Sequence, residues 1–164
     1  MAGLIGFPNP VNEKAARTVA GGVLALSALA LLLSVASDAW LWIVAALALG
    51  FVARVLTGPK LSPLGQLATK VVAPRLGEPK LVAGPPKRFA QAIGATVTIT
   101  ATALLAAGQP NWTRALLGLM IVAAGLESIF AYCIGCKVFN GLMKLGLVPE
   151  ETCAACANLA LRGA

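Results

Sequence analysis

Four long stretches of the chain consist almost entirely of apolar residues. They cover approximately residues 18–37, 40–56, 89–108 and 112–132. A helix needs about 20 predominantly apolar residues to cross a bilayer. Because backbone groups inside a membrane must bond within their own segment, we expect helices, even at residues 96–102, where threonines alternate with apolar residues as in a strand. The pattern predicts an all-α membrane protein, a single domain over residues 1–164 with four transmembrane helices.

The composition agrees with a membrane setting and narrows the chemistry. Hydrophobic residues make up 59% of the 164 positions and charged residues only 12%. This is more apolar side chain than one soluble domain can bury. The chain contains no histidine. Catalysis by a Ser-His or Cys-His pair and metal sites with histidine ligands are therefore excluded.

Positive charge is concentrated in one connection, residues 57–88, between the second and third apolar segments. The basic residues of this loop are Lys60, Lys70, Arg75, Lys80, Lys87 and Arg88. Lysine and arginine favour the cytoplasmic side of membrane helices, so the loop and both termini are expected inside. Trp40, Trp42 and Trp112 fall at the opposite ends of their segments. Tryptophan favours the membrane interface, which agrees with this topology.

The basic loop also predicts a short helix of its own. Ser62 can cap and Pro63 can start a helix over residues 62–72 that has one apolar face. This segment is too short to cross a bilayer, so we expect it to lie on the inner leaflet. The basic residues are expected to form a surface for anionic lipids or a partner protein. The alternative is that their charge only sets the topology. Nucleic-acid binding is not expected, because no recognition fold presents the charge.

All four cysteines occur in CxxC pairs within the tail that follows the fourth segment, residues 133–164. Cys133 pairs with Cys136, and Cys153 pairs with Cys156. The spacing C-x2-C-x16-C-x2-C lies in the range of four-cysteine zinc sites. In a reducing compartment such pairs also carry out thiol redox chemistry. Thiol redox or sulfur transfer, structural zinc, and neither role are all open.

The geometry of the tail bears on this choice. We expect a helical pattern to continue over residues 137–145, then a turn at 146–149 and a short C-terminal helix. On two straight antiparallel helices, the four sulfurs would be spread along the axis. A tetrahedral zinc site would therefore require a bend, for which Gly135 is the expected place. A pairwise thiol relay requires no such bend.

Glu127 is a carboxylate inside the fourth apolar segment, and such a group is a functional candidate by default. It could handle protons for the cysteines. The alternative is an interhelical contact with Arg54 or with a threonine of the third segment. Helical spacing places Glu127 and Cys133 on different faces, which argues against direct proton transfer between them.

Several runs of residues carry a resemblance to a known family. They are FPNPVN at 7–12, RVLTGPKLSPLG at 54–65, GPPKRFAQ at 84–91, and Glu127-Ser together with CIGCKVF at 133–139. With them, the chain resembles the bacterial membrane protein family named for domain of unknown function 4395 over nearly its whole length. The resemblance implies a four-helix, multi-pass protein of the bacterial inner membrane. Members of the family are often encoded near thioredoxin-like proteins or sulfurtransferases, which implies thiol or sulfur chemistry.

Three functions follow as hypotheses. The first is a membrane dithiol protein that passes electrons or sulfane sulfur to and from a cytoplasmic thioredoxin-like or sulfurtransferase partner. The second is a non-enzymatic scaffold, or a subunit of a larger membrane complex, whose four cysteines bind zinc. The third is a small-solute transporter, which is weaker because one intramembrane carboxylate and no broken helix make a poor substrate path.

Overall fold

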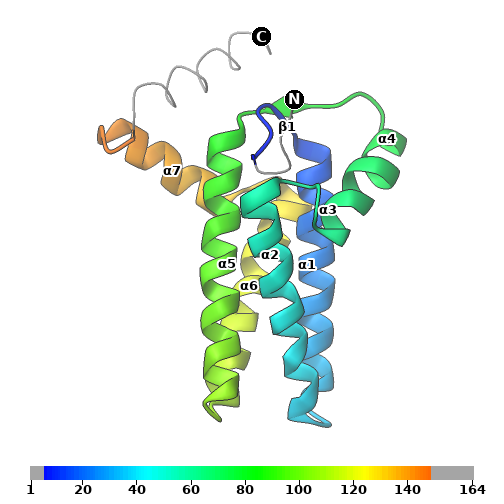
Figure 1. Cartoon of the computed structure of the whole chain (residues 1–164), viewed down its shortest axis with the longest axis vertical. Coiled ribbons are helices and arrows are strands. Elements are labelled where there is room, and N and C mark those ends of the chain that lie inside the picture. Colours follow the sequence, from blue (N-terminus) through cyan, green and yellow to red (C-terminus); the bar gives the residue numbers. More distant parts are fainter. Residues whose placement is uncertain (1–5, 149–164) are drawn as a thin grey trace.

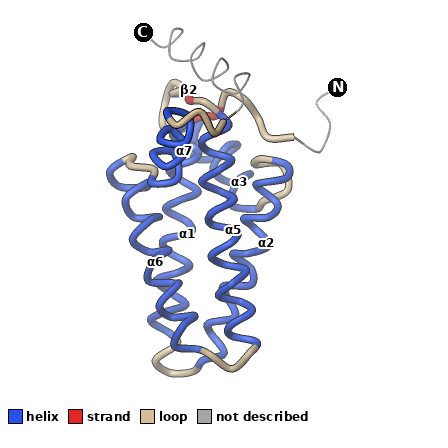
Figure 2. Tube along the Cα trace, turned by 90° about the vertical axis from the view of Figure 1, so that its left-hand side faces the viewer, coloured by secondary structure: helices blue, strands red, loops and turns tan. Residues whose placement is uncertain are grey.

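Four long helices run side by side as an upright bundle in the computed structural model, which describes residues 6–148 (Figure 1 and Figure 2). The elements in chain order are β1 (Val11–Asn12), α1 (Glu13–Leu33), η1 (Asp38–Trp42), α2 (Ile43–Thr57), α3 (Pro63–Leu67), η2 (Ala68–Val72), α4 (Ala73–Arg75), β2 (Leu81–Val82), α5 (Gly84–Ala106), α6 (Pro110–Phe130) and α7 (Ile134–Lys144). The short strands β1 and β2 pair in antiparallel fashion at one end of the bundle.

The four predicted spans are confirmed as helices. α1, η1 with α2, α5 and α6 have 21, 20, 23 and 21 residues and are long and apolar enough to cross a membrane. Threonine hydroxyls of α5 bond to carbonyls one turn earlier in the helix, as Thr98 does with Gly94. The strand-like alternation in this segment therefore has no structural consequence.

The start of α5 differs from the prediction. The helix begins at Gly84, five residues before the expected boundary at 89, and Pro85 and Pro86 lie in its first turn. Proline is tolerated there because the first N–H groups of a helix have no partner within the helix. Reading these prolines only as a break in the loop placed Lys87 and Arg88 outside the helix, and both lie inside it.

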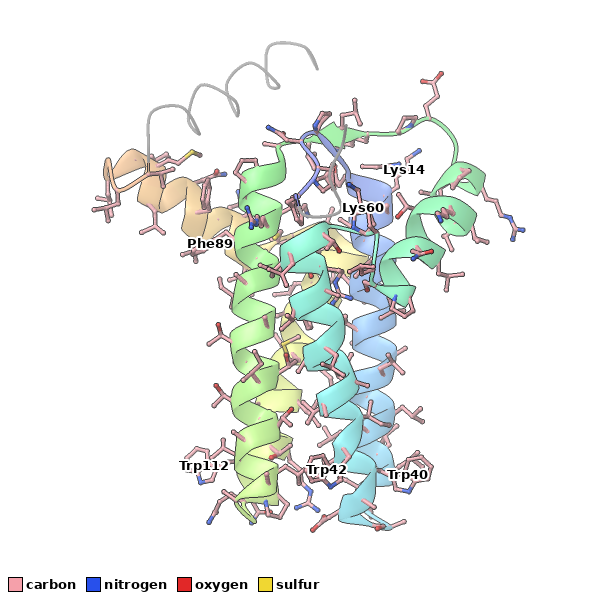
Figure 3. All side chains as sticks on the ribbon, viewed as in Figure 1. Lys14, Trp40, Trp42, Lys60, Phe89 and Trp112 are labelled. Carbon is pink, nitrogen blue, oxygen red and sulfur yellow. The ribbon has the colours of Figure 1, made fainter. Side chains whose placement is uncertain are left out.

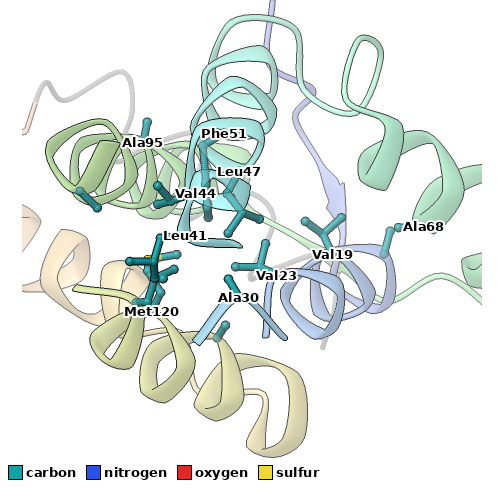
Figure 4. Packing of buried hydrophobic residues seen from close by; sticks show 14 of the residues in the cluster. Val19, Val23, Ala30, Leu41, Val44, Leu47, Phe51, Ala68, Ala95 and Met120 are labelled. Carbon is teal, nitrogen blue, oxygen red and sulfur yellow. The ribbon is translucent and has the colours of Figure 1, made fainter. Parts of the chain in front are cut away.

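The core lies between two packed helix pairs. α1 packs mainly against α6, and α2 packs mainly against α5. Their facing side chains are small or medium-sized apolar groups (Figure 4); they include Val19, Val23, Ala30, Leu41, Val44, Leu47, Phe51, Ala95, Leu117 and Met120. In lipid, the hydrophobic effect does not favour contact between helices, so close packing must hold them together. Small residues such as Ala30 and Ala95 allow the helix backbones to approach closely.

The outer surface of the bundle is apolar as well. Exposed side chains on the four long helices include Leu29, Leu32, Leu49, Ile99, Leu119, Val122 and Ile129. Trp40, Trp42 and Trp112 lie at one end of the bundle, and Lys14 and Lys60 lie toward the other (Figure 3). This separation of aromatic and basic ends is the one that the sequence predicts, while the direction in which the protein sits in a membrane stays a prediction.

The loop helix is longer than predicted. Ser62 caps it through its side chain, as expected, but the helical segment runs through α3, η2 and α4 to Arg75. The helical segment continues through Pro74, which has no backbone N–H to donate to the carbonyl four residues earlier. The preceding turn, η2, is π-helical, and in a π-helix a carbonyl bonds to the N–H five residues later, so the missing donor is not needed. Ala68 and Ala73 are buried, whereas Leu67 and Val71 are exposed.

The chain turns sharply between α6 and α7. α6 ends at Phe130, and Ala131 adopts the left-handed conformation, with φ of 56°. α7 then projects sideways from the bundle and packs on α5 (Figure 1). A zinc site was expected to require a bend at Gly135; the chain turns instead at Ala131, and Gly135 lies inside α7. A Cβ atom at Gly135 would lie 2.7 Å from the Cα atom of Ala90, so glycine is required for close approach to α5.

Gly135→Ala is expected to destabilise the protein by about 1–3 kcal/mol, because the new methyl group would push α7 away from the α5 backbone. Gly141→Ala is the matched control in the same helix, since a Cβ atom there meets nothing within 4 Å. It should be neutral or stabilising, because alanine favours helix over glycine by about 1 kcal/mol. Unfolding of both variants in mixed detergent micelles measures the difference, and equal effects would contradict the packing of α7.

Candidate functional site

The first cysteine pair lies where α7 begins. Cys133 is the N-cap residue of the helix, and its Sγ atom accepts a hydrogen bond from the backbone N–H of Cys136 at 3.3 Å. The left-handed Ala131 two residues earlier directs the chain into this cap. A sulfur at a helix N-terminus receives the positive end of the helix dipole, which favours a thiolate.

The two sulfurs of this pair are in direct contact. The thiol of Cys136 lies 2.6 Å from Cys133 Sγ and donates toward it. Both residues are free cysteines; Cys133 is buried and Cys136 is partly exposed. A disulfide bond of about 2.05 Å could form between them with little movement of the backbone.

The environment gives the two sulfurs different acidities. The pKa of Cys133 is lowered, first because the Cys136 thiol donates to it and also through the charge of Lys87, while burial and Glu127 oppose the shift. The pKa of Cys136 is raised, first because it donates that hydrogen bond and then by burial. The surroundings of the pair therefore favour the thiolate of Cys133 and the protonated thiol of Cys136.

Cys136→Ala is expected to raise the pKa of Cys133, because the variant removes the hydrogen-bond donor that stabilises its thiolate. The rise of the alkylation rate with pH should then shift to higher pH. Cys136→Ser retains a donor and should shift the profile less. Both are measured with iodoacetamide in a background where Cys153 and Cys156 are serine, and identical profiles in all three proteins would contradict the assignment.

A buried ion pair lies behind the cysteines. Lys87 Nζ of α5 donates to Glu127 Oε1 of α6 at 2.7 Å, and their side chains are only 10% and 16% exposed. The interhelical contact given as the alternative for Glu127 is present, but its partner is Lys87 and neither Arg54 nor a threonine. The expectation that Lys87 lies on the lipid or partner surface is wrong, because Lys87 is buried. The early start of α5 is the physical reason, because it carries Lys87 into the bundle.

Glu127 and Cys133 border the same cavity, although they lie on different helices. This cavity has a volume of about 180 Å³ and otherwise apolar walls, apart from Gln91. The helical spacing that placed them on different faces does not extend to Cys133, because α6 ends at Phe130 and the chain turns at Ala131. On its other side, Cys133 borders an open cleft of about 530 Å³ that Cys136 and Lys137 also line.

The other predicted residues fall into two groups. Five of the six basic loop residues, Lys60, Lys70, Arg75, Lys80 and Arg88, are exposed as expected. Cys153 and Cys156, with the predicted C-terminal helix, lie outside the described residues. Within residues 6–148, no group of three or more metal-ligating side chains is present. The four-cysteine zinc site thus depends on residues beyond this range and stays a prediction.

Sequence reasoning missed two residues at this end of the bundle. Gln91 accepts a hydrogen bond from the guanidinium of Arg54, and Lys87 has the role described above. The Pro-Pro pair at 85–86 could have indicated both residues, because prolines are common in the first turn of a helix. A helix that starts at Gly84 places Lys87 and Gln91 one turn apart on the same face.

The four long apolar helices define a helical membrane protein. Its cysteine pair lies at one end of the bundle, at the N-terminus of α7. The chain belongs to the family described as domain of unknown function (DUF4395), whose model matches residues 11–144. This is the family that the sequence motifs indicated, and its description assigns no activity. No curated protein matches the chain. No solved structure matches it either.

Proposed function

We propose that this protein is a dithiol–disulfide exchange protein of the bacterial inner membrane, in which Cys133 is the nucleophile and Cys136 the resolving thiol. One observation carries the proposal: Cys133 Sγ, at the N-cap of α7, accepts a hydrogen bond from the backbone N–H of Cys136 and is in direct contact with Cys136 Sγ. A helix N-terminus stabilises a thiolate, and a second sulfur in contact with it can close a disulfide.

The exchange reaction can be written with the groups that this end of the bundle provides. The Cys133 thiolate attacks one sulfur of a protein disulfide; a mixed disulfide forms, and the first partner thiolate leaves. Cys136 then loses its proton and attacks Cys133 Sγ, which breaks the mixed disulfide and releases the second thiolate. The Cys133–Cys136 pair is oxidised by two electrons, and the partner disulfide is reduced to two thiolates. These thiolates take up the proton released by Cys136 and a second proton from solvent.

The ion pair of Lys87 and Glu127 is proposed to support the second step. Cys136 begins with a raised pKa, so its proton must be removed as its sulfur attacks. Glu127 is a carboxylate that borders the cavity at Cys133. Lys87 contributes positive charge that favours both thiolates. Together they provide an acceptor for the proton and compensation for the negative charge on sulfur.

The cleft on the surface side provides a route for a partner. It is open, it is bordered by Cys133, Cys136 and Asn140, and it includes Lys137 beside the cysteines. A thioredoxin-like protein is the proposed partner, as the family resemblance implies, because such proteins present an exposed disulfide that can enter a cleft of this size.

Transfer of electrons to an oxidised thioredoxin tests the proposal. Reduced protein in nanodiscs, with Cys153 and Cys156 replaced by serine, should convert thioredoxin disulfide to dithiol and gain one internal disulfide. Intact mass and thiol alkylation count both changes. Absence of exchange in this background, with exchange in the unsubstituted protein, would contradict the assignment to Cys133 and Cys136.

A further inference from the structure

A second charged group is buried at the same end of the bundle. Arg54, in the last turn of α2, is only 4% exposed. Its Nε donates to Gln91 Oε1 at 2.8 Å, and its Nη1 donates to Ser62 Oγ at 2.9 Å. Its plane lies over the ring of Phe51, 4.4 Å from the centroid. The remaining nitrogen, Nη2, is buried and has no hydrogen-bond partner.

The charge of Arg54 is not balanced by any carboxylate in the described part of the chain. Ion pairs there join Lys80 to Glu13, Lys87 to Glu127 and Arg114 to Asp38. The partners of Arg54 are a neutral amide and a hydroxyl. Because a guanidinium stays protonated and an uncompensated buried charge is costly, this site calls for an anion.

A cavity at Arg54 has room for one. Its volume is about 190 Å³, and Lys87, Gln91, Asn12 and Thr69 provide its other polar groups. No acidic residue lines it, and its remaining walls are prolines, glycines and apolar side chains. A water molecule takes about 30 Å³ in the liquid, so the space suits a small ion with a few waters and is below the range of drug-sized sites.

Residues of three runs that stood out in the sequence, 7–12, 54–65 and 84–91, line this cavity together with α1 and Thr69. The N-terminal segment crosses the end of the bundle (Figure 1), where Asn9 Oδ1 accepts from the N–H of Gly84 at 3.0 Å. Pro8 lies against Gly58, where a Cβ atom would be 2.4 Å from Pro8 Cδ and φ is +63°. The wall is therefore preformed by specific close contacts.

We propose that this cavity binds a small oxyanion of the sulfate or phosphate type, either free or as the headgroup of an anionic phospholipid. Arg54 Nη2 supplies two N–H donors, and the ammonium of Lys87 and the amide of Gln91 supply more. An oxyanion accepts several such bonds at once, which a halide cannot match geometrically. Lys87 belongs to both this cavity and the ion pair beside Cys133, so the anion would lie next to the dithiol.

Titration calorimetry of sulfate and phosphate into protein in phosphatidylcholine nanodiscs tests the free-ion source, with chloride at matched ionic strength as reference. Arg54→Gln should weaken binding by about tenfold to a hundredfold, the effect of losing a charge-assisted hydrogen bond. Arg88→Gln is the control, because it removes an exposed cation one residue from Lys87 and should leave binding unchanged. Ala16→Leu fills the cavity from α1 without altering Arg54 and should weaken binding as well. This second variant tests the site even if Arg54→Gln folds poorly.

A second arm tests the lipid source. The same proteins are placed in nanodiscs that contain phosphatidylglycerol, without added oxyanion, and their thermal midpoints are measured. Stabilisation of the wild type and Arg88→Gln, but not of Arg54→Gln or Ala16→Leu, supports a headgroup in the site. A response that depends on Arg54 in either arm supports the proposal. Equal responses of all variants, as general salt stabilisation would give, or no response of the wild type in both arms, would overturn it.

Discussion

Cys136→Ser is expected to accumulate a stable mixed disulfide between Cys133 and a partner thiol, whereas Cys133→Ser should abolish exchange altogether. The serine at 136 cannot attack Cys133 Sγ, so the reaction stops after its first step. The serine at 133 removes the nucleophile itself. Incubation with oxidised thioredoxin, followed by non-reducing electrophoresis and peptide mass mapping, distinguishes the two variants.

The control for this trap is Cys153→Ser with Cys156→Ser, which should exchange like the unsubstituted protein. The order of roles follows from the cap geometry, because Cys133 is the N-cap residue whose Sγ accepts from the backbone N–H of Cys136. If Cys133→Ser forms the trapped adduct through Cys136 and Cys136→Ser does not, the nucleophile and the resolving thiol have been assigned in the wrong order.

Glu127→Gln is expected to lower the free energy of unfolding by about 3–5 kcal/mol, because it leaves the ammonium of Lys87 buried without a counter-charge. Lys87→Met combined with Glu127→Leu should recover most of this loss, since replacing both partners by apolar groups removes the uncompensated charge. Reversible unfolding in mixed detergent micelles measures each variant and gives the coupling between the two side chains.

Asp38→Asn provides the matched control for this cycle. Asp38 also forms an ion pair, with Arg114, but the two side chains are 54% and 33% exposed. Solvent screens such a pair, and its loss should cost less than about 1 kcal/mol. Similar losses for Glu127→Gln and Asp38→Asn would mean that the Lys87–Glu127 pair is not buried in the working protein.

The fold was largely predictable because membrane helices depend on local composition. Runs of apolar residues long enough to cross a bilayer indicate helices wherever they occur. The cap at Ser62 was also predictable, and its side chain accepts from the N–H of Gly65. Helix starts at proline were harder. The Gly84-Pro85-Pro86 run is compatible with both a loop and a first turn, and only packing of α5 decides between them.

The site was predictable in its residues but not in its contacts. The CxxC pair was evident, but its cap geometry depends on the left-handed Ala131, a conformation that alanine rarely adopts and that no local pattern indicates. The partner of Glu127 depends on how α5 and α6 are placed relative to each other, which is tertiary information. The environment of Arg54 requires three distant segments to meet, so sequence alone could offer Arg54 only as a possible partner of Glu127.

The most direct test of the dithiol assignment is a redox titration of the Cys153→Ser, Cys156→Ser protein in nanodiscs against glutathione buffers, with zinc content measured in parallel. One two-electron transition of Cys133 and Cys136 is expected, with a midpoint between about −270 and −120 mV, the range of exchange-active dithiols. The transition should disappear in Cys133→Ser. Thiols that stay reduced across this range, or stoichiometric zinc bound by the unsubstituted protein that protects its cysteines from alkylation, would contradict the assignment.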